Sequence, residues 1–148
     1  MGEQTTCSAI ISFAQKLQIR SSEFYKELPT KYPKHQERFL AFSDESKKVE
    51  VLITRTYQET ISDALEACFI RMNLDDYQLE TNLTKDLSYS DALKKAIALE
   101  DTAVRFYTEA AERSRALLAT IPSAFRTAAR RRNKRKSELE SLLNDLEH

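Results

Sequence analysis

The chain has 148 residues, with 23 basic and 23 acidic side chains, 41% hydrophobic residues and a single glycine. This length suits one domain with one core, and a charged fraction of 31% with short apolar runs excludes a membrane span. Because glycine and proline build most tight turns, one glycine and three prolines argue against a many-stranded barrel and for a few long helices. We therefore expect an all-α domain over residues 1–148.

The first half of the chain predicts two helices. Apolar residues recur at three- and four-residue steps from Ile10 to Leu28, which is typical of an amphipathic helix over about residues 5–29. Pro29 and Pro33 bracket a short break, because proline cannot continue the hydrogen-bonded interior of a helix. A second helix is expected over about residues 35–65.

The second half predicts two more helices after a long connection. Residues 66–89 lack a clear period but are too apolar for a disordered linker, so they should lie against the helices. Ser90 is the expected N-cap of a helix over about residues 90–119, and Pro122 marks the start of another over about 122–145. One long link between two helix pairs predicts a four-helix bundle of ferritin-like arrangement, with a crossover between helices 2 and 3.

The ends and the cysteines carry little functional signal. The start lacks the basic and apolar stretches of a secretory signal, so a cytoplasmic location is expected. The residues after Leu146 look like the start of a vector-derived tag, and positions 147–148 are set aside. Cys7 and Cys68 have no metal-binding spacing and are expected to be reduced thiols, although the sequence leaves a disulfide and the reactivity of either thiol open.

The first and third predicted helices repeat each other. The matching residues are Ala14, Leu17, Gln18, Ser21, Phe24 and Tyr25 in the first helix and Ala96, Leu99, Glu100, Ala103, Phe106 and Tyr107 in the third. A shared Phe-Tyr pair at the same phase favours duplication over two helices that merely have similar cores.

The stretch 96–107, with Glu100, Ala103 and Phe106-Tyr107, resembles the rubrerythrin-like members of the ferritin-like superfamily. In that family, helices 1 and 3 each supply a Glu and helices 2 and 4 each supply a Glu-x-x-His pair to a di-metal centre. Nearly the whole chain takes part in the resemblance. It implies a ferritin-like bundle, a homodimer and, where the ligands are kept, iron-dependent peroxide reduction.

Carrying the ligands over by position predicts a degenerate metal site. The family-equivalent positions are Gln18, Glu45, Lys48, Glu100, Arg131 and Lys134, of which only Glu45 and Glu100 retain the ligand type. A protonated lysine or an arginine cannot ligate a metal ion and repels it. The sequence therefore predicts that Lys48, Arg131 and Lys134 pair with the two carboxylates in a buried network, and that Lys48→Ala costs about 3 kcal/mol.

The run 130–136 contains six cations in seven residues, a composition that also suits nucleic acid or phosphate. On a helix, such a run faces every direction, so Arg130, Arg132, Arg135 and Lys136 are expected outside as a basic patch. Nucleic-acid binding is not expected, because the rest of the chain is net acidic and no aromatic residue is interleaved.

The sequence favours a non-catalytic scaffold or interaction protein that needs no cofactor. The alternative is a peroxide-reducing oxidoreductase of the rubrerythrin type with altered ligands and with iron or another divalent metal. A single hard cation such as magnesium, held by Gln18, Glu45, Glu100 and water, is a separate alternative for the same residues. The oxidoreductase alternative is favoured if Lys48, Arg131 and Lys134 point outward and Asp44 or Asp101 takes their place at the centre of the bundle. Nucleic-acid binding through the fourth helix is the second alternative.

Overall fold

A computed structural model describes residues 4–59, 69–114 and 120–147; residues 1–3, 60–68, 115–119 and 148 lie outside the description. The helices are α1 (Cys7–Lys31), α2 (Gln36–Glu59), α4 (Tyr89–Arg113) and α5 (Thr120–Glu147). The remaining elements are strands β1 (Gln4–Thr6) and β2 (Phe69–Arg71) and the 3-10 turn η1 (Leu74–Asp76). The predicted all-α class is confirmed for the described residues.

The helix ends follow from local capping. The Thr6 hydroxyl accepts a hydrogen bond from the Ala9 amide (3.1 Å) and begins α1. Ser88, two residues before the predicted cap, accepts from the Asp91 amide (3.0 Å) and begins α4. The prediction that α1 stops at Pro29 was wrong, because this proline lies in the last turn and the helix continues to Lys31.

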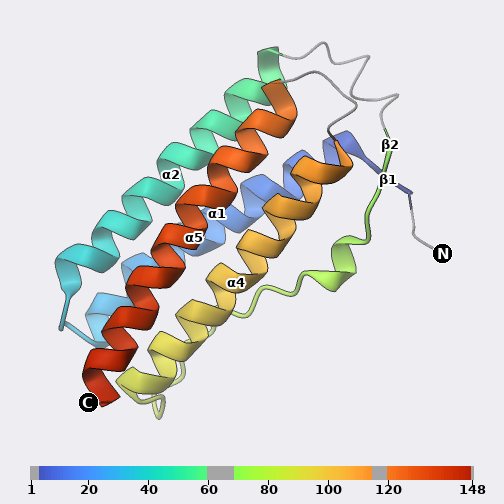
Figure 1. Cartoon of the computed structure of the whole chain (residues 1–148). Coiled ribbons are helices and arrows are strands. Elements are labelled where there is room, and N and C mark those ends of the chain that lie inside the picture. The colour runs from blue at the N-terminus through green and yellow to red at the C-terminus, as the bar shows by residue number, and fades with distance from the viewer. Residues whose placement is uncertain (1–3, 60–68, 115–119, 148) are drawn as a thin grey trace.

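The helices form two antiparallel pairs that pack side by side (Figure 1). α1 packs against α2, α4 packs against α5, and the pairs join through contacts of α2 with α5 and of α1 with α4. In Figure 1, each helix runs opposite to its neighbours. α4 ends at Arg113, and the predicted extension to residue 119 falls mostly outside the described residues.

The described part of the crossover begins with a strand pair that the sequence did not predict. β2 pairs antiparallel with β1, with Thr6 opposite Phe69. From there the chain follows the length of the bundle to the start of α4 (Figure 1). The Tyr77 hydroxyl donates to Glu109 (2.8 Å), and Arg20 donates to Thr81 (3.1 Å), so the crossover lies against both α4 and α1, as its apolar composition predicted.

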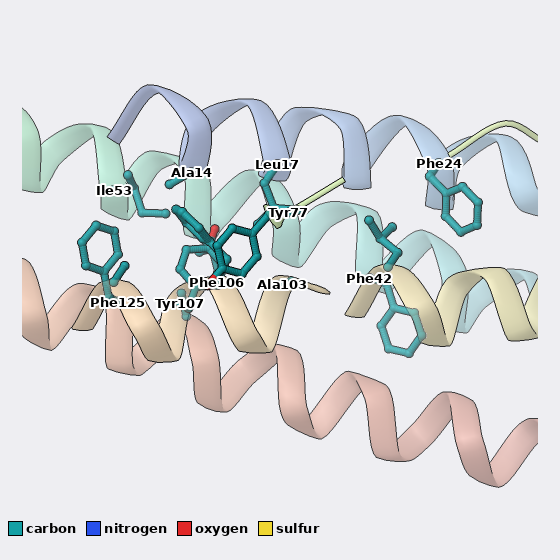
Figure 2. Packing of buried hydrophobic residues seen from close by; sticks show 14 of the residues in the cluster. Ala14, Leu17, Phe24, Phe42, Ile53, Tyr77, Ala103, Phe106, Tyr107 and Phe125 are labelled. Carbon is teal, nitrogen blue, oxygen red and sulfur yellow. The ribbon is translucent and has the colours of Figure 1, made fainter. Parts of the chain in front are cut away.

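The core follows a heptad-like spacing along each helix. On α5, the positions with this spacing are 125, 128, 132, 135, 139 and 142, and all are buried. Phe106 packs edge-on against Tyr107 (5.2 Å between centroids), and both face Phe125. Figure 2 shows this group with Ile53 at one side, and Phe42 set apart toward the other end. Two of the six α5 core positions are arginines.

Among the described residues, no helix combines the length and apolarity that crossing a membrane requires.

Candidate functional site

The candidate site lies between the two repeated helices, α1 and α4. The Tyr25 hydroxyl donates to Glu100 Oε2 (2.6 Å), and the Gln18 amide donates to the Tyr107 hydroxyl. In the repeat, Tyr25 corresponds to Tyr107 and Gln18 corresponds to Glu100. Each hydrogen bond therefore joins the tyrosine position of one helix to the Gln/Glu position of the other helix. All four side chains are buried. This reciprocity is what a duplicated helix pair related by a local two-fold axis produces, and it favours the duplication inferred from sequence.

Arg132 of α5 binds directly to the Glu100 carboxylate. Its Nη1 donates to Glu100 Oε2 (2.6 Å), and its Nη2 donates to the Ser21 hydroxyl. Ser21 donates its own proton to the Leu17 carbonyl (2.7 Å), which leaves its oxygen lone pairs available to the guanidinium. Arg132 and Glu100 therefore form a fully buried, charge-assisted ion pair.

Arg135 joins this pair to the rim of the bundle. Its Nη2 donates to Glu45 Oε1 (2.7 Å), its Nη1 donates to the Ser46 hydroxyl (2.9 Å), and the same Nη1 lies 3.7 Å from Glu100 Oε2. The guanidinium also lies 5.2 Å from the ring centroids of Tyr25 and Phe42, a distance suited to cation–π attraction. The network thus contains two buried cations, one buried anion and the half-exposed Glu45 carboxylate.

The predicted partners of the carboxylates were wrong by one residue on two helices. Lys48, Arg131 and Lys134 are all exposed, whereas the residues that directly follow them, Val49 on α2 and Arg132 and Arg135 on α5, are buried. A shift of one residue turns a helical position by about 100°, which exchanges a core position for an exposed one. The hydrophobic spacing passes through 49, 132 and 135, and this signal in the sequence would have identified the correct residues.

The prediction of an exposed basic patch at Arg130, Arg132, Arg135 and Lys136 was wrong for two of its four residues. Arg130 is exposed as expected, but Arg132 and Arg135 are buried. Lys136 is partly buried and pairs with Asp101 on the surface (3.1 Å). Asp44 is exposed and the Asp101 side chain is 49% exposed, so neither supplies a carboxylate to the centre of the bundle.

Burial and the network shift the proton affinities of the site. Burial raises the pKa of Tyr25 well above its usual value, and the adjacent Glu100 carboxylate raises it further. Burial also raises the pKa of Tyr107 to about 12. For Arg135, burial alone would lower the pKa, but the attraction of Glu100 and Glu45 outweighs it and the pKa rises. The two tyrosines stay neutral and the arginine stays charged.

The shifted tyrosines predict a loss of stability at high pH. Below about pH 10, Tyr25 and Tyr107 are protonated in the folded and the unfolded chain, so they add no pH dependence. Above it, the unfolded chain releases their protons while the folded chain retains them, so the free energy of unfolding falls, by up to about 1.4 kcal/mol per pH unit for each tyrosine. Urea unfolding between pH 9 and 12 should show a shallower decline in the Tyr25→Phe/Tyr107→Phe variant; equal slopes would contradict this assignment.

The residues at the centre of the bundle offer few ligands for a metal ion. Among the buried polar atoms of the described residues, Glu100 Oε1 and Gln18 Oε1 have no hydrogen-bond partner and are the available oxygen ligands. The guanidinium groups of Arg132 and Arg135 oppose metal binding, because they lie 2.6 and 3.7 Å from Oε2, the other oxygen of Glu100. No cluster of three or more candidate ligands (His, Cys, Asp or Glu) occurs in the described part of the chain. The donor set does not fit a di-metal centre, because two fixed cations lie against its one fully buried carboxylate.

Cys7 is disulfide-bonded, so the expectation of a reduced thiol was wrong for this residue. It is buried and directly follows β1. Cys68, the other cysteine of the sequence, lies outside the described residues.

No family model, no curated protein and no solved structure matches this chain.

Proposed function

We propose that this protein is a non-catalytic interaction protein built on a rubrerythrin-like bundle, in which a buried ion-pair network stands where a di-metal centre would be. The observation that carries the proposal is the Glu100 carboxylate, which the Arg132 guanidinium contacts at 2.6 Å with both side chains buried. A metal ion there would have to displace a fixed cation from a desolvated anion.

The arrangement of the helices supports the ferritin-like part of the proposal. Antiparallel neighbours joined by one connection along the length of the bundle are what a ferritin-like topology requires (Figure 1). The inward positions have the spacing of the family's ligands, with Ser46 and Val49 three residues apart on α2 and Arg132 and Arg135 three apart on α5. Together with Gln18 and Glu100, they make up the six positions at which the family has its metal ligands. Glu100 is the one residue among these six that is of the family's ligand type.

Ferrous-ion titration of the apo protein, followed by peroxide, tests the proposal. We expect neither a saturable heat of binding nor peroxide consumption above that of free iron. A matched positive control is the variant Gln18→Glu/Ser46→Glu/Val49→His/Arg132→Glu/Arg135→His, which restores two Glu and two Glu-x-x-His units. Stoichiometric binding and turnover by the parent chain would instead establish the oxidoreductase alternative, with iron or another divalent metal.

The homodimer implied by the resemblance belongs to the same proposal. Ile19 on α1 and Val51 on α2 are each 49% exposed, and such an interface would bury these apolar side chains. Light scattering across a tenfold concentration range measures the mass, and a monomer throughout would remove the dimer from the proposal.

A further inference from the structure

The surfaces of α2 and α5 carry a set of exposed cations, which we call the basic face. Its members are Lys48 and Arg55 on α2 and Arg126, Arg130, Arg131 and Lys134 on α5. Within the described ranges, none of them forms an ion pair. By contrast, Lys136, on the α4 side of α5, pairs with Asp101. The basic face is therefore positive charge that the described fold does not neutralise.

The two helices place these cations on adjoining ridges. α2 and α5 are neighbours that run antiparallel (Figure 1). From Arg126 to Lys134, α5 rises about 12 Å. Along a nucleic-acid duplex, that length carries about seven phosphate charges. A row of this length can thus follow a duplex backbone.

A hollow of about 180 Å³ opens between the ridges. Its lining includes Arg131, Lys134 and the buried Arg135, together with Glu45 and Glu138. Glu45 is bound to Arg135, whose Nε has no partner among the described residues. The lining of the hollow therefore combines three cations with two carboxylates, and the positive charge that it adds to the basic face comes from Arg131 and Lys134.

The residue types on the face favour phosphate over an apolar partner. Four of its six cations are arginines, whose planar fork binds phosphate through paired hydrogen bonds. Phe39, Phe42 and Phe125, the aromatic residues of these helices with described side chains, are all buried. The described side chains of this face therefore offer neither a stacking platform for unpaired bases nor the anchors of a typical protein interface.

We infer that the basic face binds the phosphate backbone of duplex nucleic acid without reading its sequence. The inference names the partner of the interaction protein proposed above and rests on that proposal. This inference is the opposite of the expectation from sequence, which was that the chain does not bind nucleic acid. That expectation assumed that Lys48, Arg131 and Lys134 point into the bundle, but all three are exposed. Exposed cations are what binding to the phosphates of a nucleic acid requires.

Fluorescence anisotropy with a labelled 20-base-pair duplex of random sequence measures the interaction from 25 to 200 mM salt. Four contacted phosphates predict that log K falls against log salt with a slope of about −4. Arg130→Gln/Arg131→Gln/Lys134→Gln should reduce this slope by about 3 and weaken binding at least tenfold at 25 mM salt. The matched control is Lys16→Gln/Lys26→Gln/Lys85→Gln, which removes the same charge from exposed sites on α1 and the crossover and should leave the slope unchanged.

Four results would overturn the inference. They are no binding at 25 mM salt, equal losses in both triple variants, equal binding to vesicles of anionic phospholipid, and tighter binding to a single strand than to the duplex. Metal analysis of the same preparations keeps the two proposals apart. A chain that carries metal and binds duplex refutes only the non-catalytic proposal, whereas a metal-free chain that ignores duplex refutes only the basic face.

Discussion

Replacing Glu100 by glutamine is expected to lower the free energy of unfolding by about 3 to 5 kcal/mol. The substitution keeps the size and shape of the side chain but removes the negative charge between Arg132 and Arg135. Each guanidinium is 1% exposed, so neither can recover its hydration without opening the bundle. Because small domains are stable by only about 5 to 15 kcal/mol, Glu100→Gln should be largely unfolded in mild urea. Urea unfolding followed by circular dichroism gives the value.

Two controls separate a buried network from the loss of any acidic residue. Asp101→Asn removes the neighbouring charge, which pairs with Arg105 and Lys136 on the surface, and should cost less than about 1 kcal/mol. Lys48→Ala, which the sequence had suggested would cost about 3 kcal/mol, should now change stability by less than about 0.5 kcal/mol, because Lys48 is exposed. Equal costs for Glu100→Gln and Asp101→Asn would refute the network.

Apolar replacement of the three buried charges of the network should restore the stability that Glu100→Gln loses. In Glu100→Leu/Arg132→Met/Arg135→Leu no buried charge is left unpaired, and such replacements are commonly neutral or stabilising. We expect this variant to match or exceed the parent. We interpret the network as charges that need one another but add little net stability. A triple variant less stable than Glu100→Gln would contradict this interpretation, because it would show that the network contributes net stability.

Opening the disulfide of Cys7 is the second large effect. In the chain-entropy model, a link that closes a loop of about 60 residues, the separation of Cys7 and Cys68, contributes about 4 kcal/mol. Cys7→Ser should therefore lower the free energy of unfolding by roughly that amount, and the reducing agent TCEP should do the same to the parent. The strand pair of β1 with β2, which brings Thr6 opposite Phe69, already holds the two chain segments together.

Thiol counts in denaturant provide the check. The parent should show no free thiol before reduction and two after it, and TCEP should not affect the stability of Cys7→Ser/Cys68→Ser. Two free thiols in protein purified under air, or a dimer that only reduction dissolves, would contradict an intrachain disulfide. The result also bears on the expected cytoplasmic location, because disulfides persist mainly in oxidising compartments.

Much of the helical architecture could be predicted because the apolar spacing is regular. The repeated residues of α1 and α4, from Ala14 to Tyr25 and from Ala96 to Tyr107, are all buried, as their matching phase predicted. The strands could not be predicted, since three residues are too few to show a period of two, and β2 exists only through its pairing with β1. Pro29 was misleading because it removes a single N–H to carbonyl hydrogen bond, and the helix continues through it for two further residues to Lys31.

The sequence placed Gln18, Glu45 and Glu100 in the candidate network, but it selected the wrong cations as their partners. A buried pairing of arginine with Glu100 was anticipated, whereas alignment to a ligand motif selected Arg131 instead of Arg132. The continuous spacing from Phe125 to Leu142 favoured the correct choice, but six cations in seven residues offer an arginine or lysine at nearly every phase. A one-residue error is therefore invisible in composition, although it exchanges the core for the surface.

The charge balance of the chain follows from this division of one cationic run. Arg132 and Arg135 face inward and pair with Glu100 and Glu45, while Arg130, Arg131 and Lys134 face outward without an ion pair in the described residues. A formal net charge of zero thus combines a compensated core with an uncompensated basic face.

The metal content of the native protein tests the central claim most directly. Protein purified without chelator from cells supplied with iron and manganese should be measured by inductively coupled plasma mass spectrometry. Because Arg132 and Arg135 occupy the surroundings of Glu100, we predict neither metal above trace level. About two equivalents per chain, the content of a di-metal bundle, would contradict the replacement of that centre by an ion-pair network.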